Sequence, residues 1–137
     1  MIRWCILCFI VEMMNWIKFR RWIWEFPQCL LGLILTKIYD VKYSETYKGI
    51  DIYKGNFPGG ISLGLYILMN SRSGNKTKNH EYGHTKQSER WGWLYLPVIG
   101  IVSGIWCTLH NLGWSKKDYY SVWPENKADK LGKVKRK

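Results

Sequence analysis

Acidic residues are scarce in this chain: ten Asp and Glu face 21 Lys and Arg, which leaves a formal net charge of +11 over 137 residues. This surplus disfavours cationic partners and favours anionic ones, namely acidic substrates, nucleic acid and anionic lipid headgroups. Nucleic acid is the least favoured of the three. No recognised nucleic-acid-binding motif is present, and the basic residues are spread along the chain.

Cysteine is also sparse. The four thiols belong to Cys5, Cys8, Cys29 and Cys107, and they form no disulfide-rich framework of the kind found in small secreted proteins. Cys5 and Cys8 make a lone C-x-x-C inside an apolar run, with no second pair or histidine nearby. We expect two buried thiols there rather than a metal or redox site. This usage fits a reducing compartment.

Histidine is rarer still, with three in the chain, yet two of them stand in one motif, His80-Glu81-Tyr82-Gly83-His84. The spacing is H-E-x-x-H, in which two histidines one helical turn apart hold a zinc ion and the glutamate activates a water. At 3.6 residues per turn both rings share one face, and Glu81, rotated by about 100°, flanks the metal. The alternative is two surface histidines spaced by accident.

The flanking sequence predicts that the motif lies on a helix. Lys78–Arg90 contains no proline. Ser73, Asn75 and Thr77 offer N-cap oxygens ahead of it, and Gly92 offers a stop behind it.

A catalytic zinc needs a third protein ligand, for which Glu125, His110 and Asp118 are the downstream candidates. We prefer Glu125, because it opens the pattern Glu-x-x-x-Asp that ends at Asp129, and residues four apart share a helix face. Pro124 suits the first turn of such a helix. The alternative is an ordinary acidic flank on a basic helix.

The two motifs together resemble those of the gluzincin branch of the zincin metallopeptidases. The resemblance implies that Glu125 is the third zinc ligand and that Asp129 braces His80. Metal-bound imidazoles usually donate their other N–H to a carboxylate or carbonyl. The resemblance covers two short motifs and not the whole chain. Gln87 and the stretch Trp91–Leu96 are also similar to small uncharacterised bacterial proteins built on the same motif.

This resemblance implies a mechanism as well as a ligand set. Zinc would lower the pKa of a bound water towards about 7, and Glu81 would take its proton and later pass it to the leaving amine. Tyr119, Tyr120 and His110 are candidates for stabilising the oxyanion, and no spacing selects among them. Two other classes stay open: a catalytically idle zincin-like scaffold at a membrane surface, and a small basic protein that binds nucleic acid or lipid.

The N-terminal part is apolar. In Met1–Phe19 a signal peptide is disfavoured, because Glu12 ends the apolar run and no small-x-small cleavage site follows. A membrane span is disfavoured by the short length and the same glutamate. Pro27 opens a second apolar helix, Gln28–Ile38, which is too short to span a bilayer. We expect the pair to pack on the metal helix, with its basic and tryptophan residues suited to an anionic membrane surface.

Residues Tyr39–Met69 are rich in β-formers, and Ile50 and Ile52 alternate with polar neighbours as in a half-buried strand. We expect a small antiparallel meander of two or three strands. Its last strand would be Ile61–Met69, with Gly64 as a bulge or a point of close approach. By the zincin resemblance, this is the edge strand that pairs with an extended substrate. A plain sheet that covers the core is an equal alternative.

Trp91–Ser115 contains no Asp, Glu, Lys or Arg and is long enough to cross a membrane. However, Glu125 must meet His80 and His84 on one side, and two crossings do not fit in 25 residues. We therefore expect a central core helix or a shallow re-entrant one. Lys127–Lys137 is expected to be a solvated basic tail that frays.

The sequence thus predicts an α+β fold, a mostly helical zincin-like domain over residues 1–137 with a small antiparallel sheet and an apolar helical part at 1–38. The expected function is zinc-dependent hydrolysis of a peptide or protein substrate. We expect a cytoplasmic location, either free or peripheral or monotopic at the inner membrane. No oligomeric state is predicted.

Overall fold

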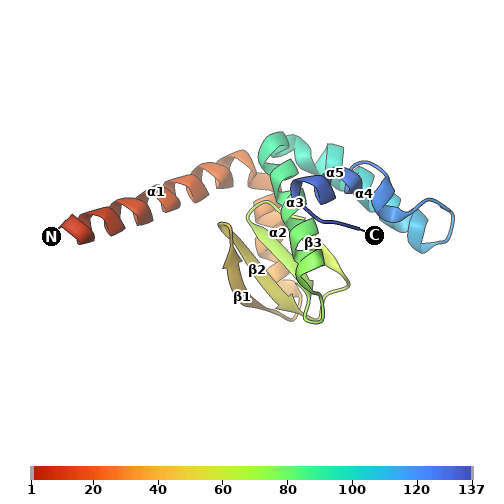
Figure 1. Cartoon of the computed structure of the whole chain (residues 1–137), viewed down its shortest axis with the longest axis horizontal. Coiled ribbons are helices and arrows are strands. Elements are labelled where there is room, and N and C mark those ends of the chain that lie inside the picture. The colour runs from red at the N-terminus through yellow and green to blue at the C-terminus, as the bar shows by residue number, and fades with distance from the viewer. Residues whose placement is uncertain (1, 137) are drawn as a thin grey trace.

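A computed structural model describes residues 2–136 of the chain, with side chains from residue 10 onward. A four-stranded sheet lies between helix α2 (Phe26–Ile38) on one face and helix α3 (Asn75–Trp91) on the other (Figure 1). Helix α5 (Glu125–Leu131) packs against α3, and helix α1 (Ile2–Trp24) runs away from the body. The predicted α+β class with mostly helical content is confirmed.

The sheet differs from the predicted meander. Its strands are β1 (Val41–Tyr47), β2 (Ile50–Gly55), β3 (Gly60–Leu63) and β4 (Tyr66–Asn70), in the order β1-β2-β4-β3. The β2 and β4 strands are parallel, so the sheet is mixed. The predicted single strand Ile61–Met69 is wrong: Gly64, with φ of +63°, turns the chain and makes a hairpin of β3 and β4. The parallel pairing lets β4 sit between two strands and bury both of its faces.

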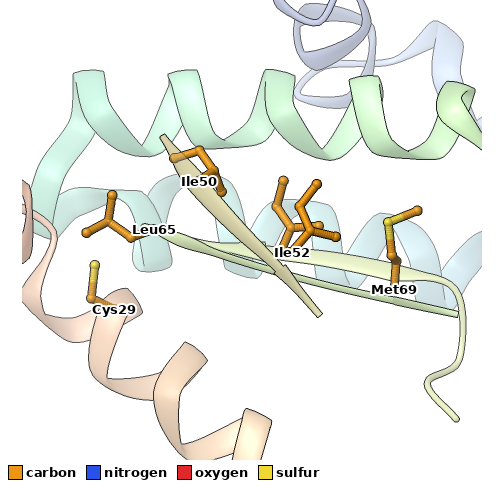
Figure 2. Close-up of a cluster of buried hydrophobic side chains, with 6 residues drawn as sticks. Cys29, Ile50, Ile52, Leu65 and Met69 are labelled. Carbon is orange, nitrogen blue, oxygen red and sulfur yellow. The ribbon is translucent and has the colours of Figure 1, made fainter. Parts of the chain in front are cut away.

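Alternation along β4 explains this burial. Ile67 and Met69 join Ile50 and Ile52 of β2 in a cluster on the face towards α3, as Figure 2 shows for the last three. The intervening Leu68 points to the opposite face, in a second cluster to which α2 contributes. Each of these fully buried side chains contributes roughly 1.5–3 kcal/mol of transfer free energy. Buried apolar side chains therefore pack on both faces of the sheet, and α3 covers one of these faces.

The apolar helices α1 and α2 do not pack as a pair on α3, and that prediction is wrong. Helix α2 lies on the sheet, where Gly32 allows close contact with Tyr66. Most of the α1 side chains after residue 9 are exposed, and only the end of α1 is attached to α3. The buried Arg21–Glu25 ion pair and a hydrogen bond from Ser88 to Glu25 make that attachment.

The prediction of a central core helix in Trp91–Ser115 is also wrong. The segment folds as two irregular turns, η1 (Gly92–Leu94) and η2 (Leu96–Gly100), followed by helix α4 (Ile101–Asn111), which has no buried residue. Within residues 2–136, no single helix has the length and apolar character of a membrane span. The two helical segments Asn75–Leu94 and Leu96–Asn111 reach the length and apolar character of a membrane span only when they are taken together, and they are bent by 119° relative to each other.

The predicted fraying tail is folded over its first part. Lys127 belongs to α5, and the chain then turns back so that the Val134 amide donates to the Asp129 carbonyl. Arg136 forms a two-pronged ion pair with the Asp129 carboxylate. The basic end is thereby tied to α5 and does not fray, whereas the lysine side chains along it are exposed, as predicted. Of the cysteines, Cys29 is buried and Cys107 half-buried, and both are free; the predicted burial of Cys5 and Cys8 lies outside the described side chains.

Candidate metal centre

The H-E-x-x-H motif lies on α3, as predicted. The His80 and His84 rings are both buried, stand perpendicular to each other and have centroids 4.8 Å apart. Gly92 ends the helix, as its stop signal predicted, with a positive φ of +54° that favours glycine. The start of the helix differs from the prediction: Gly74 is the N-cap, and no side chain caps the first turn.

Helix α5 brings Glu125 to the two rings. Its Oε2 lies 3.0 Å from His80 Nε2 and 3.1 Å from His84 Nε2. The three donor atoms lie within 4.8 Å of one another, and all three residues are buried. Donors bound at about 2.0–2.1 Å to a tetrahedral zinc would be about 3.3 Å apart. The two histidines and one carboxylate therefore form a group that could hold one metal ion.

The other two candidate ligands lie outside this group. His110 is exposed on α4, where its ring contacts Tyr119 at 5.6 Å. Asp118 is exposed in the turn ahead of Tyr119. Neither residue belongs to a group of three metal-binding side chains among the described residues.

Each member of the group is held from behind by a second side chain. His80 Nδ1 lies 2.7 Å from Asp129 Oδ1, which is where the predicted bracing residue was expected. His84 Nδ1 lies 2.7 Å from Gln87 Oε1, and the Ser103 hydroxyl donates to the other Glu125 oxygen. Sequence reasoning missed the roles of Gln87 and Ser103. Gln87 had a signal, because a residue three positions after His84 is its neighbour on the helix; Ser103 had none.

These partners settle which ring nitrogens carry protons. The Gln87 amide nitrogen donates to the Pro124 carbonyl at 3.0 Å, so its oxygen faces His84 and must accept from Nδ1–H. The Asp129 carboxylate likewise accepts from His80 Nδ1–H. The Nε2 atoms are then left with lone pairs that converge on an anionic carboxylate oxygen. Three converging lone pairs repel one another unless a cation, a proton or a metal ion, lies between them.

The pKa shifts at the centre agree with this. Burial opposes charge on Glu125, but the two imidazoles that face its Oε2 outweigh burial and hold the pKa of its carboxyl below the usual range. Burial likewise opposes charge on His80, yet the facing Glu125 and the nearby Glu81 and Asp129 raise its pKa. The centre therefore attracts positive charge.

Two glycines allow α5 to approach α3 closely enough for this geometry. A Cβ on Gly83, inside the motif, would overlap the backbone of Ala128 on α5. A Cβ on Gly132 would overlap the carbonyl of Asn79 on α3. A glycine in a helix interior costs about 1 kcal/mol relative to alanine. Gly83 is thus explained by the backbone contact that places Glu125 opposite the histidines.

Glu81 lies beside the ligand group and outside it. Its side chain is buried, and charges rather than hydrogen bonds from the described residues act on its carboxylate. Burial raises the pKa of Glu81, against the lowering influence of the two imidazoles. The carboxylate lies against strand β3, where a Cβ on Gly60 would come within 2.7 Å of Glu81 Oε1. A glycine at the start of β3 therefore makes room for this carboxylate.

A cavity of about 980 Å³ opens over the group. His80, Glu81, His84 and Glu125 line it, together with the edge strand β3 from Gly60 to Leu63 and with α4. The β3 strand pairs with β4 on one side only, so its other backbone edge has no strand partner within the sheet. The predicted edge strand Ile61–Met69 covers both β3 and β4. Of these two, β3 lies at the edge of the sheet and lines the cavity, whereas β4 lies inside the sheet.

The three residues predicted to stabilise an oxyanion all line this cavity. The Tyr120 ring stands edge-on to His80 at 5.1 Å and is covered by the Arg136 guanidinium at 3.1 Å from its centroid. Tyr119 packs against Tyr120, and burial together with the negative charge of Glu125 raises the pKa of Tyr119 well above its usual value. A tyrosine that stays protonated can donate its O–H. His110 lies at the outer end, against Tyr119.

Comparison of the chain with protein-family models, with curated proteins and with solved structures gives no match. Functional inference therefore depends on the geometry of the site.

Proposed function

We propose that this protein is a zinc-dependent hydrolase of peptide bonds, related in its site to the gluzincin metallopeptidases. One observation carries the proposal: two imidazole Nε2 atoms and a carboxylate oxygen, from helices 45 residues apart in sequence, converge with their lone pairs on one point. Two histidines and a glutamate are a ligand set of catalytic zinc. When bound, zinc would supply a Lewis acid that polarises a carbonyl and acidifies water.

The residues of the chain have defined tasks in this proposal. Glu81 is buried at the cavity without a protein hydrogen-bond partner among the described residues, so it is free to take a proton from water and return it to a leaving amine. Its raised pKa suits both steps better than that of an exposed glutamate. Tyr119 and Tyr120, which also line the cavity, are the candidate donors to the developing oxyanion.

A polypeptide substrate suits the shape of the cavity. The backbone edge of β3 lines one wall, beside Glu81, and an extended segment placed there would gain main-chain hydrogen bonds by strand addition. Leu31 and Ile61 also line the cavity and offer apolar contacts to the substrate's side chains. The proposed substrate is therefore an extended peptide with an apolar residue near the cleaved bond.

Metal analysis combined with a Glu81→Gln variant tests the proposal. Wild-type protein should retain about one zinc per chain after purification, and Glu81→Gln should retain it while losing peptide hydrolysis by roughly 10²–10⁴-fold. Glu125→Gln should lose both metal and activity. Glu89→Gln is the matched control, because this half-buried carboxylate on the same helix forms its ion pair with Lys86 and does not line the cavity. Turnover that survives Glu81→Gln would rule out the hydrolase.

A second candidate is a catalytically idle scaffold in which the same three residues only hold α3 and α5 together. The direct contacts of both histidines with Glu125 favour it, since a shared proton also satisfies them. In that case Glu125→Gln would change stability, whereas zinc would be absent from wild-type protein purified without chelator and would not bind on titration.

A further inference from the structure

Helix α4 and the turns before it expose an apolar face that nothing in the described chain covers. Leu94, Ile101, Ile105 and Leu112 are each 55–57% exposed, and Pro97 is exposed between the first two. Ile101 and Ile105, four residues apart, share one side of α4. Pro97 precedes them on η2, Leu112 follows the end of α4, and Leu94 lies before the bend between η1 and η2. We call these five residues the α4 face. The whole segment from residue 91 to residue 115 has no charged side chain.

The α4 face continues into a group of exposed aromatic rings where α1, α2 and η1 meet. The Trp93 indole is 58% exposed, donates to the Ile23 carbonyl at 2.8 Å and lies 6.3 Å from the Phe26 ring. Trp24, also more than half exposed, donates to the Glu89 carbonyl and packs on Gly92. We call Trp24, Phe26 and Trp93 the aromatic junction. The junction is fixed by these bonds, so its rings stay at the surface.

Positive charge flanks this surface at both ends. Arg90 is exposed just before the uncharged segment, and Lys116 and Lys117 are exposed just after it. Trp114, which is 76% exposed, comes two residues before Lys116 in the sequence. In the same way, Trp93 comes three residues after Arg90. An apolar surface with indoles and cations at its ends matches the layers of a membrane interface, where the indoles and cations lie at the level of anionic headgroups.

We propose that the α4 face and the aromatic junction together bind the surface of an anionic lipid bilayer, with the apolar side chains entering the headgroup boundary. A bilayer accounts for the uncharged length and for the charge at both ends. The inference does not depend on the proposed hydrolase.

Vesicle co-sedimentation of the full chain tests this inference. Wild-type protein should bind vesicles of phosphatidylglycerol and phosphatidylcholine, and less strongly vesicles of phosphatidylcholine alone. The triple variant Leu94→Ser/Ile105→Ser/Leu112→Ser removes three exposed side chains that do not line the cavity, and its partition coefficient should fall by about tenfold or more. For Lys116→Glu/Lys117→Glu, the partition coefficient should fall by a similar factor on anionic vesicles and stay unchanged on phosphatidylcholine vesicles.

The matched control is Ile38→Ser. Ile38 is 69% exposed at the end of α2 that is farthest from the aromatic junction, so its loss should leave vesicle binding unchanged. Should the triple variant fail to fold, as judged by circular dichroism, the lysine pair tests the same surface. If the folded variants bind vesicles as strongly as wild type does, the inference is overturned. The membrane contact would then be assigned to α1. A dimer in solution that the triple variant converts to a monomer would also overturn the inference, because the face would then bind a second copy.

Discussion

Two side-chain contacts of single residues decide whether the imidazoles can serve as metal ligands. His80 is oriented by Asp129 and His84 by Gln87, and in each case the Nδ1 proton is engaged and Nε2 is left with its lone pair. A zinc ligand must present such a lone pair. The pair of histidines alone would leave both tautomers open.

Replacing Gln87 should therefore weaken metal binding without touching a ligand. In Gln87→Leu the His84 ring loses the acceptor for Nδ1–H, and we expect the zinc dissociation constant to rise by roughly 10–100-fold. Competition with a chromophoric chelator measures it. Lys86→Ala is the control, since this neighbouring side chain pairs with Glu89 at the surface and should leave the constant unchanged. Equal affinities for Gln87→Leu and wild type would show that Gln87 does not orient the ring.

At the scale of elements, the site depends on the contact between α3 and α5. His80 and His84 come from one helix, Glu125 and Asp129 from the other, and the two backbones touch at Gly83 and Gly132. Burial of the α3 face against the sheet holds one half of the site, because Ile50, Ile52 and Met69 pack there (Figure 2).

The Gly83→Ala substitution tests this contact. Its Cβ would overlap the Ala128 carbonyl, so α5 must move away and carry Glu125 with it. We expect about 1–3 kcal/mol of destabilisation, as for other overpacked sites, together with loss of bound zinc. Gly104→Ala on α4 is the paired control, because its Cβ meets no atom within 4 Å. That variant should be neutral or up to about 1 kcal/mol more stable. Urea unfolding and metal analysis report both effects.

At the scale of the whole molecule, the cavity and the α4 face share a border. Ile101 belongs to the α4 face and also lines the cavity, and Leu31, exposed on α2, lines it as well. A protein lying on a bilayer by this surface would have the mouth of its cavity near the headgroups. If the proposed hydrolase and the proposed membrane contact both hold, the substrates are polypeptides held at a membrane.

Peptide hydrolysis on vesicles checks this combination. A lipid-anchored fluorogenic peptide library on anionic vesicles should be cleaved at least about tenfold faster than the same library free in solution, because both reactants share one surface. The triple serine variant should lose this advantage and keep wild-type turnover of the free peptides. If free and anchored peptides are cleaved at the same rate, the membrane contact gives the hydrolase no advantage and the combination is wrong. If neither form is cleaved, the result counts against the hydrolase alone.

Much of the site could be predicted because its geometry is local. Residues four apart on a helix share a face whatever surrounds them, so His80 with His84 and Glu125 with Asp129 were predictable from spacing. Gln87 was within reach by the same rule. The convergence of the two helices was supplied by a resemblance and not by periodicity, and Ser103 joins Glu125 from a third helix with no sequence pattern to reveal it.

The chain's sequence by itself determined the helices that carry the two motifs, the alternation of Ile50 and Ile52 in β2, and which side chains with metal-binding chemistry stand on a common face, because each follows from neighbours within a few residues. Only the tertiary structure decided that β4 enters the sheet between β2 and β3, that α5 meets α3 at Gly83, and that Tyr95 and Ile99 of the apolar segment after Trp91 are buried while helix α4 buries none of its residues. Those outcomes depend on which apolar faces bury one another across long sequence separations, and an apolar residue pattern does not specify its partner. The uncharged segment from residue 91 to residue 115 is equally compatible with a buried core helix and with the exposed surface that we propose binds a lipid bilayer.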